Sequence, residues 1–98
     1  MIVEHAVLQV RPGLEEEYIE AISGATHLIA ATPGFRSIRV VRGIESPSQF
    51  VLLVEWDTIE AHTEGFRGSE AFLEWRAALH HFYEPAPVVE HFEIIAEA

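Results

Sequence analysis

The chain contains no cysteine. This absence excludes disulfide bonds, thiolate nucleophiles, cysteine-held iron–sulfur clusters and zinc–thiolate sites. Basic residues are scarce as well, because six Lys and Arg stand against sixteen Asp and Glu and give a formal net charge of −10. Such a chain repels phosphate backbones and anionic lipid surfaces, so neither nucleic acid nor a membrane is an expected partner.

Long apolar runs and cofactor motifs are also missing. No segment approaches the ~20 consecutive apolar residues of a membrane-spanning helix, and the first residues lack the pattern of a secretory signal. These features predict a cytoplasmic protein. The sequence has no glycine-rich nucleotide loop, no serine-nucleophile signature and no zinc-protease spacing, so neither a cofactor nor a metal site is expected.

The chain does have enough apolar residues for a core. It is 98 residues long, with 49% apolar and 22% charged residues. This composition is typical of one globular domain, which we assign to residues 1–98. The length leaves no room for a separate cofactor-binding domain.

Apolar periodicity and turn residues predict four strands and two main helices. The strands are expected over residues 2–10, 35–44, 49–57 and 88–96, and the helices over 14–31 and 69–83, with a short helix over 59–66. Gly24 is expected to weaken the first helix without breaking it, and Ser69 to cap the last one. The order β-α-β-β-α-β predicts an α+β fold, a ferredoxin-like sandwich whose helices cover one face of an antiparallel sheet.

The second face of the predicted sheet is also apolar. On the third strand, one face is formed by Phe50, Leu52, Val54 and Trp56, while Val51 and Leu53 lie on the other. The helices can cover only one of these faces. The other face is expected to pack against a second copy, which predicts a homodimer with a barrel-like interface between two sheets.

The segment from Phe50 to Trp75 resembles a known family. Its strand is followed by Glu60-Ala61-His62-x-x-x-Phe66, by Ser69 and by Phe72-x-x-Trp75. In these residues, and in the element order of essentially the whole chain, it resembles the antibiotic-biosynthesis monooxygenase family of dimeric α+β barrels. The resemblance implies a small dimer with a pocket between each sheet and its helices. In some members this pocket hosts cofactor-independent oxygenation of polycyclic phenols or quinols, and in others haem degradation or isomerisation.

His62 is the candidate catalytic residue. A neutral imidazole takes or gives a proton near physiological pH, which suits deprotonation of a phenol before it reacts with oxygen. The alternative is a histidine that only forms a hydrogen bond where helix and sheet pack together.

Aromatic side chains are the candidate substrate-binding residues for a small aromatic molecule. They are Phe66, Phe72 and Trp75, together with Trp56 at the mouth of the pocket. At helical spacing the same rings also fit an ordinary core. Trp75 is the expected exception, because a large indole needs an outlet for its N–H.

Other histidines allow further combinations. His5 and His91 have the same parity on strands expected to be neighbours, with Glu55 on the next strand, so the three residues suggest either a metal site or interface hydrogen bonds. The haem-degrading branch pairs a first-strand Asn with a helical Trp and His, and this chain has neither that Asn nor a His beside Trp75. Of the adjacent His80 and His81, at most one can face a pocket.

The leading hypothesis is a cofactor-independent monooxygenase acting on a small phenolic or quinol compound. Its substrate would have to be a good reductant, since no bound group is expected to supply electrons to oxygen. The alternatives are a non-catalytic dimeric ligand-binding or stress-related domain and, in third place, a haem-binding protein.

Overall fold

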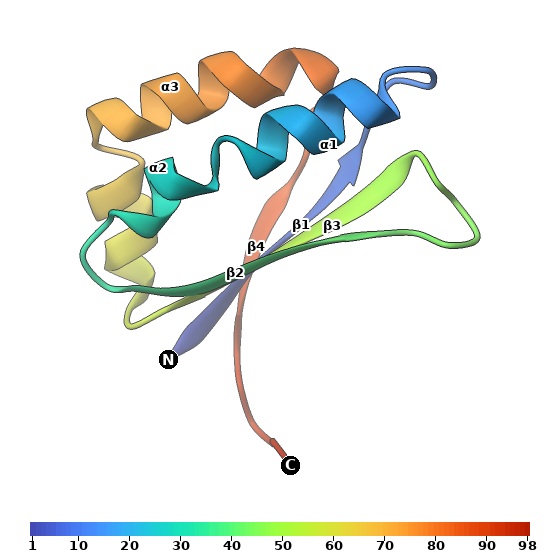
Figure 1. Ribbon diagram of the computed structural model, residues 1–98. Coiled ribbons are helices and arrows are strands. Elements are labelled where there is room, and N and C mark those ends of the chain that lie inside the picture. The colour runs from blue at the N-terminus through green and yellow to red at the C-terminus, as the bar shows by residue number, and fades with distance from the viewer.

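A four-stranded antiparallel sheet carries all the helices on one face, as the computed structural model of residues 1–98 shows (Figure 1). The elements are β1 (Ile2–Gln9), α1 (Glu15–Ser23), α2 (Thr26–Ala30), β2 (Phe35–Arg42), β3 (Gln49–Trp56), η1 (Ala61–Phe66), α3 (Glu70–Leu79), η2 (His80–Phe82) and β4 (Val89–Glu93). The strand order is β2-β3-β1-β4. The predicted α+β, ferredoxin-like fold is confirmed.

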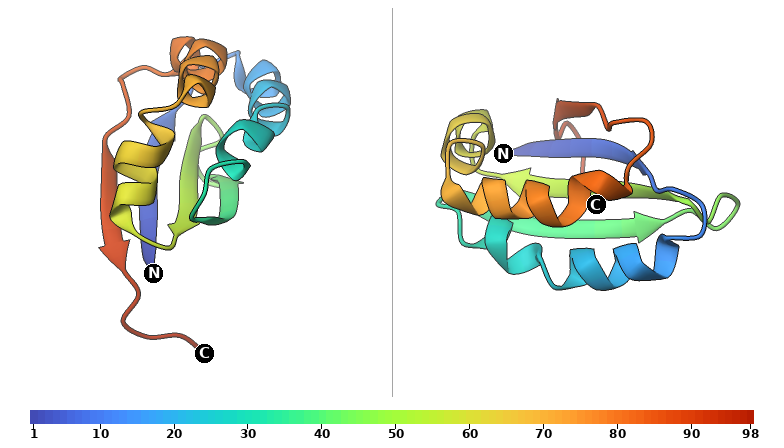
Figure 2. Two further views of the ribbon diagram at one scale, coloured as in Figure 1. Left: turned by 90° about the vertical axis from the view of Figure 1, so that its left-hand side faces the viewer. Right: turned by 90° about the horizontal axis from the view of Figure 1, so that it is seen from above.

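The second face of the sheet is not covered by any element of the chain. Figure 2 shows α1, α2 and α3 together on one side of the strands, and the residues after β4 extending away from the sheet. None of the helices is both long and apolar enough to cross a membrane.

The helix predicted over residues 14–31 is in fact two helices. α1 ends at Ser23 and α2 begins at Thr26, so the expectation that Gly24 leaves the helix unbroken is wrong. The Ala25 amide bonds the carbonyl of Ile22, three residues back, at 3.1 Å, and this tighter turn interrupts the α-helix. Both short helices contribute buried residues to the core, Tyr18 and Ile22 from α1 and Ile29 from α2.

The last helix and the last strand are shorter than predicted. α3 begins directly after Ser69, whose Oγ accepts a hydrogen bond from the Phe72 amide at 3.3 Å, so the predicted cap is confirmed. The helix ends at Leu79 and is followed by one 3₁₀ turn. β4 stops at Glu93 because this residue pairs with Ile2, where β1 begins and the neighbouring strand offers no further partner.

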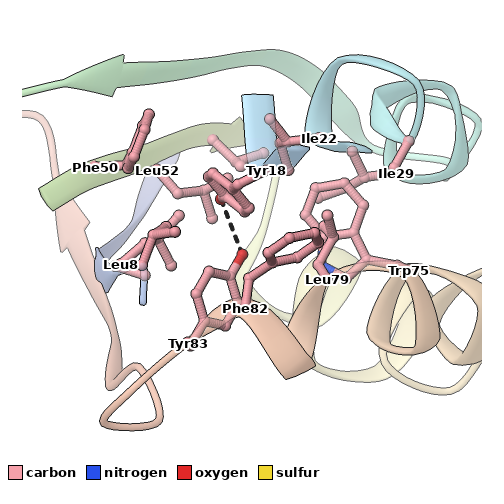
Figure 3. Packing of buried hydrophobic residues seen from close by; sticks show 14 of the residues in the cluster. Leu8, Tyr18, Ile22, Ile29, Phe50, Leu52, Trp75, Leu79, Phe82 and Tyr83 are labelled. Carbon is pink, nitrogen blue, oxygen red and sulfur yellow. Dashed lines mark hydrogen bonds between the residues drawn. The ribbon is translucent and has the colours of Figure 1, made fainter. Parts of the chain in front are cut away.

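The core lies between the helices and the even-numbered residues of β1 and β3. The predicted buried face of β3 is confirmed, since its residues Phe50, Leu52, Val54 and Trp56 are all buried. On β1 the buried positions are Glu4, Ala6 and Leu8. At one end of this layer Tyr18 and Tyr83 point toward each other, and their hydroxyl oxygens are 2.9 Å apart (Figure 3).

Candidate functional site

A cavity of about 370 Å³ lies between the sheet and α3. Its walls come from the even-numbered residues of β1, from η1, from one face of α3 and from the residues around the start of β4. Its volume falls within the range of small-molecule sites, about 300–1,000 Å³. Most lining residues are hydrophobic, nine of fifteen, so the cavity suits a largely apolar molecule with a few polar groups.

Four polar side chains from four different elements meet at one end of this cavity. The Nε1–H of Trp56 donates a hydrogen bond to Glu4 Oε1 at 3.0 Å, and His62 Nε2 lies 3.4 Å from the same oxygen. On its other side, His62 Nδ1 lies 2.8 Å from His91 Nε2. The Glu4 oxygen favours the tautomer of His62 that carries its proton on Nε2. We therefore assign the lone pair to Nδ1, which accepts the hydrogen bond from His91.

The π-helical geometry of η1 places His62 and Phe66 on its buried side. In this wider turn the Arg67 amide bonds the carbonyl of His62, five residues back, at 3.0 Å. Such turns are frequent at functional sites. Gly34 allows the chain before β2 to pass close to η1, because it has φ +90° and an added Cβ would lie 2.7 Å from the Cβ of Ala61.

Burial shifts the pKa values of His62 and Glu4 in opposite directions. Burial first, then the charge of Arg67 and the nearby His91, together lower the pKa of His62 to about 4. His62 is therefore neutral at neutral pH. Burial raises the pKa of the Glu4 carboxyl group, against the hydrogen bond from Trp56 and the charge of Arg67, which both lower it. A carboxylate with a raised pKa is a better proton acceptor than an exposed one.

Two buried residues on the cavity wall each have a polar side-chain atom without a partner within the protein. The structure contains no fully buried side-chain nitrogen or oxygen without a hydrogen bond. Glu4 is engaged through Oε1 alone, so its Oε2 is unpaired and accessible, in a residue that lines the cavity. The Nε1–H of Trp75 likewise has no partner and is not fully buried, although only 8% of the residue is exposed and the residue lines the cavity. This is the outlet that the indole was expected to need.

The structure brings most of the predicted site residues together. His62, Phe66, Phe72 and Trp75 all line the cavity. Phe66 packs edge to face against Phe72 and Trp75, with ring centroids 5.5 and 5.9 Å apart. Trp56 does not line the cavity, and its expected position at the mouth is wrong. It is fully buried, with its ring stacked on His62 at a centroid distance of 5.4 Å and its N–H bound to Glu4.

Glu4 was not predicted as a site residue, and His91 lies on the other face of the sheet from the one predicted for it. His91 pairs with Glu4 across the strands and shares its helix-covered face, whereas His5 pairs with Glu90 on the opposite face. The suggested grouping of His5, His91 and Glu55 is therefore wrong, and the structure has no group of three or more His, Asp or Glu residues suited to a metal ion. One signal was available: Glu4 is the only carboxylate among the alternate, otherwise apolar positions of the first strand.

The two histidines after α3 behave as adjacent residues of a helical turn should. His80 lines the cavity and His81 does not. The expectation that at most one of them faces the pocket is confirmed.

Comparison with known proteins gives consistent matches. Residues 1–78 match the family model described as antibiotic biosynthesis monooxygenase. The chain is 44% identical over 93 residues to the uncharacterized protein YczJ of Bacillus subtilis (strain 168), a match that covers 95% of this chain and 98% of that protein.

Solved structures agree with these sequence matches. A Bordetella bronchiseptica protein assigned to the antibiotic biosynthesis monooxygenases superposes with a TM-score of 0.92 at 30% identity, over 97% of both chains. SnoaB, a cofactor-independent oxygenase from Streptomyces nogalater, superposes with a TM-score of 0.85 over 98% of this chain and 94% of its own. At 17% identity the likeness to SnoaB shows a shared fold alone.

Proposed function

Because the chain belongs to the antibiotic biosynthesis monooxygenase family, we propose that it is a cofactor-independent monooxygenase acting on a small phenolic or quinol compound. The observation that carries this proposal is a buried carboxylate, Glu4, which has one unpaired oxygen and lines a cavity walled by aromatic rings. The rings offer apolar surface to a flat substrate, and the carboxylate can accept its hydroxyl proton.

Glu4 is better suited than His62 to accept this proton. With its pKa lowered to about 4, His62 is a weak base, and its Nδ1 lone pair is occupied by the hydrogen bond with His91. The pKa of Glu4 is raised, and one of its oxygens is free. We therefore assign His62 a positioning role: it holds Glu4 through Nε2 and, being neutral, adds no charge that would weaken the base.

The substrate itself supplies the electrons for the proposed reaction. After its hydroxyl proton passes to Glu4, the phenolate gives one electron to O₂, and the resulting phenoxyl radical and superoxide combine in a new C–O bond. The carboxyl group returns the proton to the peroxide, and loss of water leaves a quinone. One oxygen atom of O₂ thus ends in the product and the other in water. The apolar walls limit the access of water to the radical pair.

The open face of the sheet supports a homodimer. Val7, Val41 and Phe92 are large apolar residues on this face, with 38%, 45% and 50% of their surface exposed. An apolar sheet face that no helix covers favours burial against a second copy, which would unite two sheets. Light scattering at micromolar concentration should give the mass of a dimer, and the mass of a monomer would contradict this arrangement.

Oxygen uptake tests the enzymatic proposal. With 1,4-dihydroxynaphthalene as substrate, the protein should raise uptake above spontaneous oxidation, and Glu4→Gln should lower kcat by roughly 10²–10⁴-fold because it removes the proton acceptor. The matched control is Glu74→Gln on α3, an exposed residue outside the cavity, which should keep the wild-type rate.

Two results would count against the proposal. A wild-type rate in Glu4→Gln would remove Glu4 as the base. Binding of the quinol without any increase in oxygen uptake would favour the alternative function, a non-catalytic ligand-binding domain.

A further inference from the structure

The basic residues of this acidic chain are unevenly distributed. All six are arginines. Arg11, Arg36 and Arg42 each form an ion pair with a carboxylate. Arg39, on the open face of the sheet, has no ion pair. Arg67 and Arg76 line the cavity, and neither side chain forms an ion pair or a hydrogen bond within the protein. In a chain of sixteen carboxylates, two unpaired guanidinium groups therefore border one cavity.

Helix geometry places these two charges at the rim of the aromatic walls. Arg67 directly follows η1, whose last residue Phe66 lines the cavity. Arg76 lies four residues after Phe72 and four before His80, so these three side chains share one face of the helical segment. Both arginines are exposed, in contrast to the buried rings beside them.

The charge of Arg67 reaches the interior of the cavity. It lowers the pKa of the buried Glu4 and His62 and of the half-buried His91, which are joined at the polar end of the cavity. A positive charge that acts on all three groups favours an anion within the cavity.

A second, independent observation is the indole of Trp75. The residue is more than nine-tenths buried and lines the cavity, and its N–H is accessible and has no partner within the protein. Apart from the Glu4 carboxylate and the imidazole of His80, which can accept as well as donate, the free polar groups around the cavity are hydrogen-bond donors: two guanidinium groups and one indole N–H. A complementary ligand must supply oxygen acceptors, and two arginines favour a negatively charged one.

We propose that the ligand of this cavity is an aromatic hydroxy acid, with its ring among Phe66, Phe72 and Trp75 and its carboxylate bound by Arg67 and Arg76. This assignment rests on the proposed function for the position of the hydroxyl group, at Glu4. In this orientation the ligand carboxylate and the Glu4 carboxylate lie at opposite ends of the ligand, and the reactive hydroxyl group points inward. The indole N–H of Trp75 donates to a ligand oxygen.

Calorimetric binding with a matched pair of probes tests this proposal. 6-Hydroxy-2-naphthoate has a hydroxyl group and a carboxylate at opposite ends of two fused rings, and 2-naphthol lacks the carboxylate. The acid should bind at least about tenfold more tightly than 2-naphthol, since charge-assisted bonds to arginine are strong. Added salt should reduce this preference.

Variants identify the groups responsible. Arg67→Gln and Arg76→Gln should each weaken binding of the acid several-fold, and the double variant should bind both probes equally. Arg36→Gln removes the same charge from an exposed ion pair outside the cavity and should keep the preference. Trp75→Phe keeps a ring but loses the N–H donor. It should therefore weaken the binding of both probes by the contribution of one hydrogen bond.

The outcomes separate this inference from the proposed function. Equal binding of the two probes, no binding of either, or a preference that survives in the double variant would overturn the inference, even if 1,4-dihydroxynaphthalene still supports oxygen uptake. A preference for the acid that disappears in the double variant supports it, even if no quinol is oxidised.

Discussion

Two buried polar contacts join the helices to the sheet, and they differ in what their protons can do. Tyr18 and Tyr83 meet near the end of β1, where Val10 pairs with Tyr83. Burial raises the pKa of both hydroxyl groups, that of Tyr83 to about 12, so this pair is neutral at any physiological pH. Glu4 and His62 meet near the start of β1, and their pKa values are shifted in opposite directions, Glu4 upward and His62 downward.

Packing differs between the two contacts as much as chemistry does. The ring of Tyr18 is enclosed edge-on by Phe50, Phe82 and Tyr83, at centroid distances of 5.0, 5.5 and 5.6 Å (Figure 3). Glu4 has a free oxygen beside a cavity. Burial alone therefore does not distinguish a structural contact from a reactive one. Tyr83 lines the same cavity, but its pair with Tyr18 stays neutral, whereas Glu4 is ionisable and has an unpaired oxygen for a ligand.

The largest expected effect on stability is at the Tyr18–Tyr83 pair. Tyr18→Ala should lower the free energy of unfolding by about 3–5 kcal/mol, because it leaves a large cavity among rings that cannot collapse into it. Urea unfolding followed by circular dichroism measures the loss. A loss below about 1 kcal/mol would show that this end is no more tightly packed than the other.

Acidification should change the contribution to stability of the end that holds Glu4 and His62. His62 has a folded-state pKa of about 4, below its ordinary value of 6.5, so its contribution to stability is present above pH 6.5 and is lost as the pH falls toward about 4. Glu4 acts in the opposite sense, because its raised pKa makes protonation favour the folded state.

The contribution of His62 to stability is measured by comparing the wild type with the variant His62→Asn. Between about pH 7 and pH 5 the wild type should lose about 1–2 kcal/mol more than the variant, by urea unfolding at each pH. Parallel curves for the two proteins would mean that His62 titrates normally in the folded state. The tyrosine pair is silent in this range and loses stability only when the pH rises above 10, where unfolded tyrosines ionise.

Removal of one hydroxyl group from the Tyr18–Tyr83 pair should have a smaller effect on stability. Tyr18→Phe keeps the ring and deletes the hydrogen bond with Tyr83, so we expect a loss of about 1 kcal/mol in the free energy of unfolding. Oxygen uptake should be unchanged, because Tyr18 does not line the cavity. A large loss of activity would show that the two ends are coupled.

The smallest effect on stability is expected from Glu4→Gln. At neutral pH the substitution removes a buried charge and keeps an oxygen that can accept from Trp56, so the free energy of unfolding should stay within about 1 kcal/mol or rise. A loss above about 2 kcal/mol, by the same urea titration, would show that the Glu4 charge holds this end together.

Most of the fold could be predicted because it depends on local periodicity. Alternation identified the buried face of β3, and the Ser69 cap marked the start of α3. The break at Gly24 could not be foreseen, since the gain comes from seating Tyr18 and Ile29 of two separate helices in one core. The limit of β4 depends on where its partner strand begins.

The candidate site was predicted less completely. His62, Phe66, Phe72 and Trp75 lie on one contiguous stretch, and helical spacing was enough to bring them to a common cavity. Trp56 was misassigned, because spacing along a strand does not say what lies above its end. Glu4 and His91 were not grouped, since a shift of one residue in strand register exchanges the two faces of the sheet.

The sequence by itself determined the order of the elements, the buried face of the central strand and the aromatic segment that belongs to the family, because these features depend on residues near one another in the chain. Only the tertiary structure decided that Glu4, His62 and His91 share a proton network, and that Arg67 and Arg76 border the same cavity. The physical reason is that strand register and desolvation, which set contacts and pKa values between distant residues, exist only once the chain is packed.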